Sequence, residues 1–384
     1  MKRPGDRATR PLRLMQVLEP SGGGSGRHFL DLCRGLKQRG HVVHAAYSPR
    51  RAEERFVGEL LSLGLDGVHP VDMARAPGPS DFGAWRRLRG LMREHGPFDA
   101  VHGHSSKAGA LTRLRLPGPH VPRIYTPHAF RTMDPGLGPA GYFAYGLIER
   151  CLARFLTDQL ICVSADEYAH ARALGMSRRK LSIIVNGVEE PAHGLRRRIR
   201  TELALPDNAL VFGFVGRLSA QKAPERLIDA FTIAARTLPH AYLLMVGSGE
   251  LERQVRERIA KSPAADRIRL TMHYTGRQAM DAIDVLAMPS RYEAMSYVML
   301  EAAAAGRPLV LTEVGGASTV LEDGRNGILV ANIDDPAQFA RAMIKASDPK
   351  RLARYETEAA RKQGDYGLPR MIAETEAVYR QWAK

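Results

Sequence analysis

Short apolar segments of strand length alternate with longer, helix-like segments along most of the chain. The first example is an apolar run at residues 12–18, a glycine-rich segment, a helical pattern at 27–39 that ends at Gly40, and a second apolar run at 41–46. A strand, a helix and a second strand in this order form a parallel pair, because only a crossover connection returns the chain to the same end of a sheet. The sequence therefore predicts an α/β fold with helices on both faces of parallel sheets.

Two series of such strands are predicted. The first continues at 99–103, 123–125, 159–163 and 181–185, and the second runs through 210–215, 241–246, 267–270, 284–288, 308–311 and 327–330. Between them, residues 187–200 contain Pro191, Gly194 and a run of arginines, which we interpret as a hinge. We predict two doubly wound Rossmann-like domains facing across a cleft, at 1–190 and 191–364, and a C-terminal helix at 365–384 that packs back on the first domain.

Length and composition agree with two domains. The 384 residues are 44% hydrophobic, which is enough for sizeable cores. The chain has no run of 18 apolar residues, and its basic start leads into a short apolar run with Arg13 and Gln16, which favours a first strand over a signal peptide. The three cysteines, Cys33, Cys151 and Cys162, lack metal-site spacing and favour buried thiols in a reducing cytoplasm. We therefore expect a cytoplasmic protein.

The chain is strongly basic, with a formal net charge of +15, and the surplus is larger in residues 1–190 than in the remainder. An anionic partner such as a membrane surface or a lipid diphosphate would account for this charge, and a generic solubilising surface is the alternative. The sequence contains no zinc finger and no basic stripe interleaved with aromatic residues. We therefore expect no nucleic-acid partner.

Two glutamates, Glu293 and Glu301, lie on either side of a predicted helix start. The apolar run at 284–288 is stopped by Pro289-Ser290, and a helical stretch without Gly or Pro follows from Ser296. Glu293 is therefore predicted in a strand-to-helix loop, with Glu301 about two helical turns further on. At the carboxyl edge of a parallel sheet, such a loop offers N–H groups to phosphate and a carboxylate to hydroxyls. Two ordinary surface glutamates are the alternative.

Arg217 and Lys222 lie in a second predicted strand-to-helix loop. It follows the apolar strand at 210–215 and precedes a helix that begins near Pro224. A forked guanidinium and a compact ammonium in one loop could bracket a diphosphate, whereas a lone basic loop residue is usually only solvated.

The glycine-rich segment at 21–26, which includes Gly23 and Gly24, follows the first strand and precedes a helix. Glycines allow backbone N–H groups to approach a phosphate closely, so this segment would suit a dinucleotide as well as another diphosphate. The second strand ends at Ala46-Tyr47 without an acidic residue for a ribose, which argues against a dinucleotide cofactor.

The histidines are candidate metal ligands. We interpret His102 and His104 as lying on opposite faces of a strand, where they would be poor partners for one ion, and we expect no metal. His104 and Lys107 lie at a strand-to-helix opening and are candidates for acceptor contact. His128 follows a strand and Pro127, and a structural hydrogen-bonding role is its alternative.

Two helical patterns have an apolar face of ambiguous purpose. Residues 85–93 are basic and place Trp85, Leu88 and Met92 on one face, as a helix covering a sheet or a membrane-surface helix would. The stretch 142–156 presents the same two alternatives.

Several further motifs accompany these loops. Together the set is Gly216-Arg217-Leu218 with Lys222, Val246-Gly247-Ser248-Gly249-Glu250, Pro289-Ser290 with Glu293 and Glu301, Ala305-Gly306-Arg307-Pro308, Val314-Gly315-Gly316, the segment 21–26, Thr126-Pro127-His128 and Asn186-Gly187-Val188. Through these residues the chain resembles the retaining family-4 glycosyltransferases with the GT-B fold, over residues 12–384. Where the family often has Gly-Phe-Gly after its first glutamate, this chain has Ala294-Met295-Ser296.

The resemblance implies transfer of a hexose from a UDP- or GDP-sugar to a glycan acceptor, such as a polyprenyl-diphosphate-linked precursor of a bacterial exopolysaccharide or lipopolysaccharide. It implies retention of configuration and no cofactor. Catalytic roles fall on Glu293, Arg217, Lys222 and His128. Donor contacts fall on Glu301, which would hold the ribose, and on Ala294, Met295, Ser296, Gly23, Gly24 and Gly247.

A peripheral position on the inner face of the plasma membrane would suit a lipid-linked acceptor.

Two other classes of protein remain open. A nucleotide-sugar epimerase or isomerase shares the two-domain fold but lacks the combination of Arg217 and Lys222 with the two glutamates. A non-catalytic basic binding module is the third.

Overall fold

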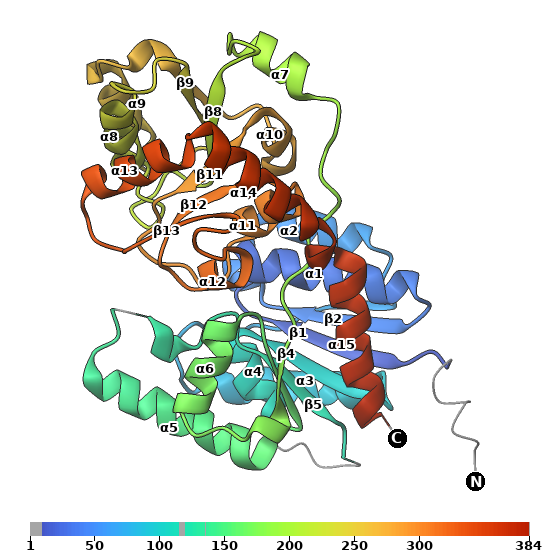
Figure 1. The fold of residues 1–384 in the computed structure, drawn as a ribbon. Coiled ribbons are helices and arrows are strands. Elements are labelled where there is room, and N and C mark those ends of the chain that lie inside the picture. Colours follow the sequence, from blue (N-terminus) through green and yellow to red (C-terminus); the bar gives the residue numbers. More distant parts are fainter. Residues whose placement is uncertain (1–9, 115–119, 135, 384) are drawn as a thin grey trace. The chain divides into compact units, whose positions relative to one another are not determined.

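The computed structural model describes residues 10–114, 120–134 and 136–383, which form two compact units. The first unit contains the described residues up to Gly187 and returns at Leu368, and the second unit is Val188–Gly367. Each unit has one parallel sheet with helices around it (Figure 1). The described part of the chain contains no helix that is both long and apolar enough to cross a membrane.

The first unit is built on a sheet of seven strands in the order β3-β2-β1-β4-β5-β6-β7. The order reverses between β1 and β4, so the chain winds outward from the middle of the sheet in both directions. The strands are β1 (Arg13–Leu18), β2 (Val42–Tyr47), β3 (Gly67–Pro70), β4 (Ala100–His104), β5 (Arg123–Thr126), β6 (Gln159–Cys162) and β7 (Leu181–Ile183). The edge strand β3 was not predicted, because its four residues are only partly buried and carry no run of apolar side chains.

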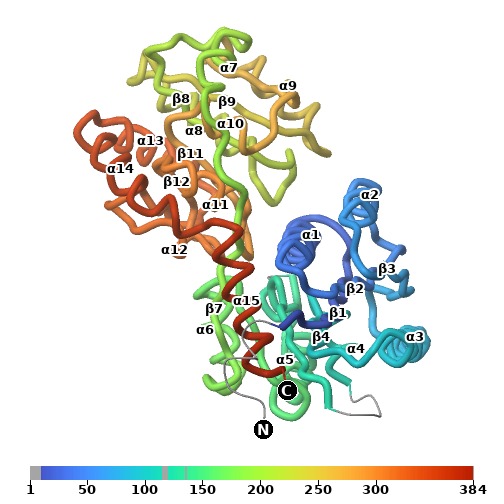
Figure 2. Tube along the Cα trace, turned by 90° about the vertical axis from the view of Figure 1, so that its right-hand side faces the viewer, coloured from blue at the N-terminus to red at the C-terminus, as the bar shows by residue number. Residues whose placement is uncertain are grey.

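Six helices of the first unit connect these strands, and a seventh comes from the end of the chain. They are α1 (Gly23–Gln38), α2 (Glu54–Ser62), α3 (Ser80–Glu94), α4 (Ser105–Arg113), α5 (Pro139–Leu156), α6 (Ala165–Ala173) and α15 (Leu368–Trp382). Helix α15 packs against α1, where a Cβ atom on Gly35 would lie 2.1 Å from the Ile372 side chain (Figure 2). Glycine at position 35 therefore permits the close approach of the two helices.

The second unit repeats the same winding on a six-stranded sheet, in the order β10-β9-β8-β11-β12-β13. The strands are β8 (Leu210–Val215), β9 (Ala241–Val246), β10 (Ile268–Thr271), β11 (Val285–Met288), β12 (Leu309–Thr312) and β13 (Gly327–Val330). The helices are α7 (Arg196–Glu202), α8 (Pro224–Ala234), α9 (Glu252–Lys261), α10 (Gly276–Ala282), α11 (Tyr297–Ala304), α12 (Ala317–Val320), α13 (Pro336–Ala346) and α14 (Pro349–Arg361). Phe212, Phe214 and Phe231 form the centre of its core.

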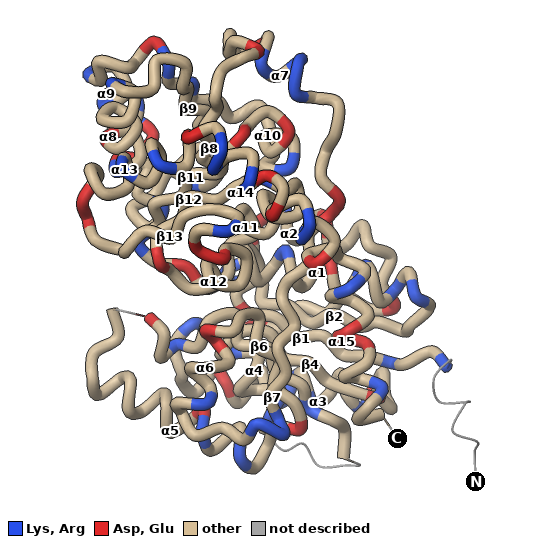
Figure 3. The backbone as a smooth tube through the Cα atoms, in the orientation of Figure 1, with Lys and Arg blue, Asp and Glu red and all other residues tan. Residues whose placement is uncertain are grey.

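The arginine run interpreted as part of a hinge lies instead in α7, which carries several basic residues (Figure 3). Arg200 is fully buried and donates to the Asp284 carboxylate and to the carbonyls of Pro206, Asp207, Ala209 and Ala282. Arg196 also binds Asp284. The hinge interpretation was wrong for this part, because the arginines belong to a helix that Arg196 and Arg200 tie to Asp284 within the second unit.

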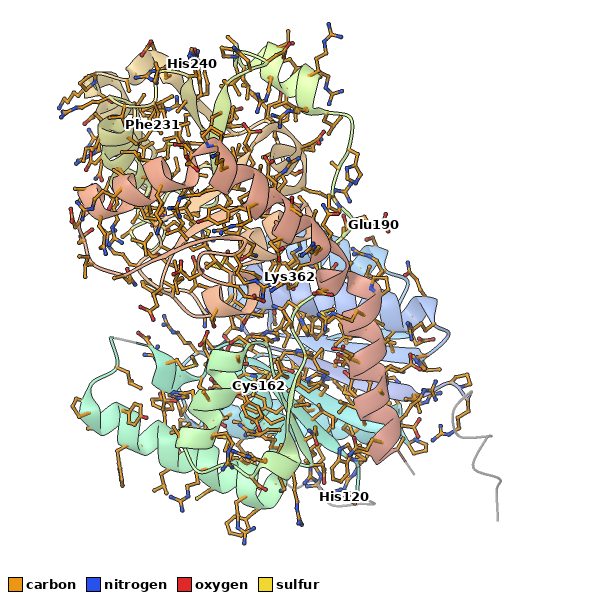
Figure 4. The ribbon with its side chains drawn as sticks, in the orientation of Figure 1. His120, Cys162, Glu190, Phe231, His240 and Lys362 are labelled. Atoms are coloured by element: carbon orange, nitrogen blue, oxygen red, sulfur yellow. The ribbon has the colours of Figure 1, made fainter. Side chains whose placement is uncertain are left out.

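Two of the three cysteines are buried, as predicted, and one is not. Cys33 lies on α1 and Cys162 at the end of β6 (Figure 4), and burial raises the pKa of both thiols. Cys151 is exposed on α5. The prediction was wrong for Cys151 because the face of α5 that carries it is turned to solvent.

Candidate functional site

The second unit brings several sequence motifs to one edge of its sheet. All six strands are parallel, so their carboxyl ends share that edge, and the strand order reverses between β8 and β11. Ligands of doubly wound sheets bind outside the carboxyl ends of the strands at this kind of reversal. The loop with Arg217 and Lys222 follows β8, and the loop with Glu293 follows β11.

Glycines bring the loops after β8 and β9 into direct contact. Gly216 has φ 151° and Gly247 has φ 146°, and a Cβ atom on Gly247 would lie 2.0 Å from the Gly216 carbonyl oxygen. The Leu218 N–H donates to the Ser248 carbonyl at 2.9 Å, which locks the two loops together. Gly247 therefore shapes the backbone beside Arg217, and its predicted direct contact with the donor stays a prediction.

Lys222 and Glu293 form an ion pair across the strand reversal. The Lys222 Nζ atom lies 2.6 Å from Glu293 Oε1, and the two side chains are 14% and 6% exposed. Gln221 donates to the Tyr292 carbonyl at 3.0 Å, and the Arg291 N–H donates to the Gln221 carbonyl at 2.8 Å. The two loops thus hold each other, and two side chains selected independently from the sequence meet in the structure.

Arg217 differs from Lys222 in having no partner. Its side chain is exposed, and it has neither a hydrogen bond nor an ion pair within the part of the chain that the structure describes. A guanidinium presented in this way keeps all five of its N–H donors available for an anion.

Glu301 is buried on α11, and its carboxylate lies against the start of α10. A Cβ atom on Gly276 would be 2.4 Å from Glu301 Oε2. Gly276 is the first residue of α10, after Thr275, which caps that helix together with Gln278. Glycine at position 276 therefore permits the close approach of the Glu301 carboxylate to the start of α10.

The segment 294–296 forms the entry to α11. Ser296 is the N-cap, and Met295 and Ser296 are buried. Gly315 and Gly316 pack beneath this turn, since a Cβ atom on Gly315 would lie 2.4 Å from the Glu293 carbonyl oxygen. Gly315 and Gly316 thus pack against the backbone of Glu293 and Ala294. The first N–H groups of α11 carry the partial positive charge of a helix start.

In the first unit, Gly23 and Gly24 belong to the first turn of α1 and not to a loop ahead of the helix. The Gly23 N–H donates to the Glu53 carboxylate at 3.2 Å, and a Cβ atom on Gly22 would lie 2.6 Å from the same side chain. A carboxylate therefore occupies the helix start, at the kind of position that suits an anion.

The four histidines His28, His102, His104 and His128 lie together below that helix start. The His102 and His104 rings are 4.0 Å apart, so the prediction that they face opposite sides of the strand was wrong. Side chains alternate with a period of two, and residues two apart therefore share a face. His102 Nδ1 forms a hydrogen bond with the Tyr379 hydroxyl at 2.6 Å and Nε2 one with the Thr126 hydroxyl at 2.9 Å, which gives it a structural role.

His104 and His128 contact each other directly. His104 Nδ1 lies 3.2 Å from His128 Nε2, and His104 Nε2 lies 3.0 Å from Gln16 Oε1. Burial lowers the pKa of both histidines well below the usual value and that of His28 to about 4, so all three rings are neutral at neutral pH. His128 is half-buried and has φ 51°, an uncommon conformation for a residue with a side chain.

Lys107 is buried, and its ammonium is already paired. Both Asp81 oxygens accept from Lys107 Nζ at 2.7 Å, and the Ala76 carbonyl accepts at 3.0 Å. Lys107 thus ties the start of α3 to α4. The Lys107 ammonium is therefore bound to Asp81 and is not presented to solvent. Its role in acceptor binding stays a prediction.

Glu167 was missed in the sequence, although it holds the backbone beside His128. Its Oε1 accepts from the Ala129 N–H and its Oε2 from the Val163 N–H, both at 2.7 Å. Burial raises the pKa of this carboxyl to about 7. Its position in the first turn of α6 after Ser164 gave only an ordinary helix-start signal.

Replacing Glu167 with alanine is expected to destabilise the protein by about 1–3 kcal/mol, because two buried N–H groups lose their acceptor. Turnover should also fall, since Ala129 (φ 80°) and His128 lose the bond that stabilises their left-handed backbone. Urea unfolding and steady-state assays would measure both effects, with Asp166→Ala on the same helix turn as the control. Unchanged unfolding in Glu167→Ala would contradict this role.

Comparisons with known proteins place the chain in a family. Residues 22–190 match the model described as Glycosyltransferase Family 4, and residues 209–348 match the one described as Glycosyl transferases group 1. The D-inositol 3-phosphate glycosyltransferase 2 of Catenulispora acidiphila is 30% identical over 307 residues, which are 75% of this chain and 72% of the relative. The chain belongs to the family-4 glycosyltransferases.

Two further similarities refine this assignment. The UDP-Gal:alpha-D-GlcNAc-diphosphoundecaprenol alpha-1,3-galactosyltransferase of Escherichia coli is 29% identical over 66% of this chain and 68% of its own. The crystal structure of HepE from Anabaena in complex with UDP has a TM-score of 0.81 at 18% identity, over 96% of this chain and 100% of the other. The predicted fold class, GT-B with two Rossmann-like domains, is confirmed.

Proposed function

We propose that this glycosyltransferase moves a hexose from a UDP- or GDP-sugar to a polyprenyl-diphosphate-linked glycan precursor of a bacterial surface polysaccharide, with retention of configuration. The observation that carries the donor assignment is the pair formed by Lys222 and Glu293 at the strand reversal of the second unit. Arg217, which has no partner among the described residues, lies in the same loop as Lys222. Two cations and a carboxylate at this edge would suit a nucleoside diphosphate and its sugar, which supports the proposal.

The leaving group in this reaction is a nucleoside diphosphate, whose oxygens gain negative charge as the glycosidic bond breaks. Arg217, Lys222 and the first amides of α11 would stabilise that charge without a metal ion. Lys222 has three N–H donors and uses one for Glu293 at 2.6 Å, so the others remain for phosphate oxygens. Bound phosphate and bound sugar are thereby linked through one pair of side chains.

The two glutamates take different parts of the donor. Glu293 would accept hydrogen bonds from sugar hydroxyls, and Glu301 would accept them from the ribose hydroxyls. His128 would contact the reacting sugar, and Gly23 and Gly24 would present amides to the diphosphate once Glu53 moves away. The acceptor hydroxyl would attack from the face that the diphosphate leaves, and a phosphate oxygen would take its proton.

Known relatives support both substrates. The Anabaena protein was crystallised with UDP and with UDP-glucose, and the Escherichia coli relative acts on a diphosphoundecaprenol-linked sugar. The Catenulispora relative points to an inositol phosphate acceptor instead. A surface feature of the first unit favours the lipid-linked acceptor.

Helix α5 presents an apolar stripe to solvent. Phe143, Leu147, Cys151 and Phe155 follow one another at intervals of four residues and are all exposed, with Phe143 at 73% and Phe155 at 71%. The exposed charges on this helix, Arg150 and Arg154, are basic, and most of α5 is uncharged in Figure 3. An apolar stripe with basic neighbours suits the surface of an anionic membrane. In contrast, α3 buries Ala84, Leu88 and Leu91 and is a covering helix.

Replacing Phe143, Leu147 and Phe155 together with serine is expected to abolish reversible binding to anionic vesicles. Binding of the unchanged protein should fall as salt rises, because the basic residues contribute about 1 kcal/mol each through interactions screened over about 8 Å. Co-sedimentation across a salt series measures this. Leu61→Ser, which changes a comparably exposed residue on α2, is the control. A triple variant that still binds would exclude α5 as the contact.

Charge removal gives an independent test of the membrane contact. Neutralising Arg86, Arg87 and Arg89 should weaken vesicle binding more than neutralising Arg196, Arg197 and Arg198. The reason is that the first set lies in the more basic first unit and Arg196 is already paired with Asp284.

The proposed function is tested by incubating the protein with UDP- and GDP-sugars, with and without three acceptors: a polyprenyl-diphosphate sugar, inositol 3-phosphate and water. Product that forms only with the lipid-linked acceptor and keeps the donor's anomeric configuration supports the proposal. Product that forms with inositol 3-phosphate would identify that compound as the acceptor in place of the lipid-linked sugar. Donor isomerisation without transfer would favour an epimerase, and binding without chemistry would favour a non-catalytic module.

A further inference from the structure

Three histidines of the first unit turn ring nitrogens toward one another. His28 lies on α1, His104 ends β4, and His128 follows β5. One ring nitrogen of each lies within 4.8 Å of those of the other two. When imidazole nitrogens bind a tetrahedral ion at about 2.0–2.1 Å, two of these nitrogens lie about 3.3 Å from each other. The distance between His104 Nδ1 and His128 Nε2 is 3.2 Å. Small side-chain rotations would complete the set.

Two of these rings are already oriented as metal ligands. His28 Nδ1 lies 2.9 Å from Asn186 Oδ1, so this nitrogen carries the proton, and the buried Nε2 atom has a free lone pair and no hydrogen-bond partner. His104 Nε2 faces Gln16 Oε1 in the same manner, which leaves Nδ1 as the bare nitrogen. Metal-bound histidines typically donate their second N–H to such an oxygen, which fixes the tautomer and the ring plane.

The type of ligand and the burial indicate which ion would fit. Three neutral imidazoles without a carboxylate suit Zn²⁺ or a similar transition metal, whereas Mg²⁺ and Ca²⁺ require oxygen ligands. His28 and His104 are buried and His128 is half-buried, so His128 is the most exposed member of the group. Three protein ligands leave the fourth coordination position of a tetrahedral ion to a water molecule.

We propose that His28, His104 and His128 bind one Zn²⁺-class ion, with water as the fourth ligand, and that this ion inhibits the transferase. On binding, the His128 proton moves from Nε2 to Nδ1, so no net proton is released. The binding part of the proposal is independent of the proposed function. The inhibition rests on it, because the ion would withdraw His128 from the sugar and His104 from the acceptor.

The binding is tested with the untagged full-length protein, Co²⁺ as a spectroscopic probe and Zn²⁺ titration by calorimetry. One equivalent of Co²⁺ should give the intense visible bands of a tetrahedral site, and Zn²⁺ should remove them. His28→Gln should abolish the bands, and Asn186→Ala should weaken binding by about 10–100-fold through the loss of the orienting oxygen. Circular dichroism confirms that both variants are folded. Absence of tetrahedral bands in the unchanged protein would overturn the proposal.

A matched control comes from a second histidine group. His44, His69 and His95 also lie together, with His44 Nδ1 and His69 Nε2 3.2 Å apart. His69→Gln should leave the Co²⁺ spectrum unchanged. Loss of the bands in this variant but not in His28→Gln would show that the ion binds to the second histidine group and would overturn the proposal. Zn²⁺ should slow transfer by the unchanged protein far more than transfer by His28→Gln, each relative to its own metal-free rate. Equal inhibition would overturn the inhibitory part while leaving the transferase assignment intact.

Discussion

Replacing Lys222 with alanine is expected to lower turnover by about 10²–10³-fold at saturating donor. The ammonium is positioned by Glu293 beside the strand reversal, and the reaction places new negative charge on the departing diphosphate. Loss of one preorganised donor to such a charge typically has an effect of this size. Arg217→Ala should lower turnover to a similar extent if its guanidinium binds the same diphosphate, as proposed.

The two variants should differ in stability. Lys222→Ala leaves the largely buried Glu293 carboxylate without its cation, and we expect a loss of about 1–3 kcal/mol. Arg217→Ala removes an exposed side chain without a partner among the described residues and should unfold like the unchanged protein. Steady-state kinetics and urea unfolding measure both effects, and Lys345→Ala, an exposed lysine of the same unit, is the control. Near-normal turnover in either variant would rule out its role toward the leaving group.

Glu293→Gln is expected to reduce turnover strongly while changing nucleotide affinity little. Contacts to the reacting sugar can strengthen as the glycosidic bond breaks, so their loss appears in kcat. Glu301→Gln should weaken nucleoside diphosphate binding, because the proposed contact with the ribose would be equally strong in the ground and transition states. Calorimetry with UDP and with GDP separates the two variants and identifies the preferred base. Equal loss of affinity in both would contradict the division of roles.

The architecture was predictable where local pattern and tertiary packing agree. The strand at 284–288, the turn at Pro289-Ser290 and the helix that follows each carry a clear signal, and β11 and α11 lie within one residue of the expected bounds. β3 carries no such signal because it is a short edge strand. The start of α1 was misjudged because consecutive glycines resemble a loop, although Glu53 caps the Gly23 N–H from a distant part of the chain.

The candidate site was partly predictable. The sequence indicated that Lys222 and Glu293 serve one ligand, but it carried no information that they pair with each other, because 71 residues separate them. The histidine group was misjudged through an error in strand alternation, and its orienting residues Gln16 and Asn186 come from other elements. Glu167 was missed for the same reason, since its partners lie on two other segments.

The return of the chain to its first unit makes the second unit an insertion. The polypeptide enters it at Val188 and leaves it at Gly367, and these two residues pair as neighbours in a β-bridge, with the Val188 N–H donating to the Tyr366 carbonyl at 2.8 Å. Both ends of the inserted segment therefore meet at one place. A unit whose two ends already lie side by side could be exchanged as a whole between related chains, because only one junction with the first unit would have to be preserved.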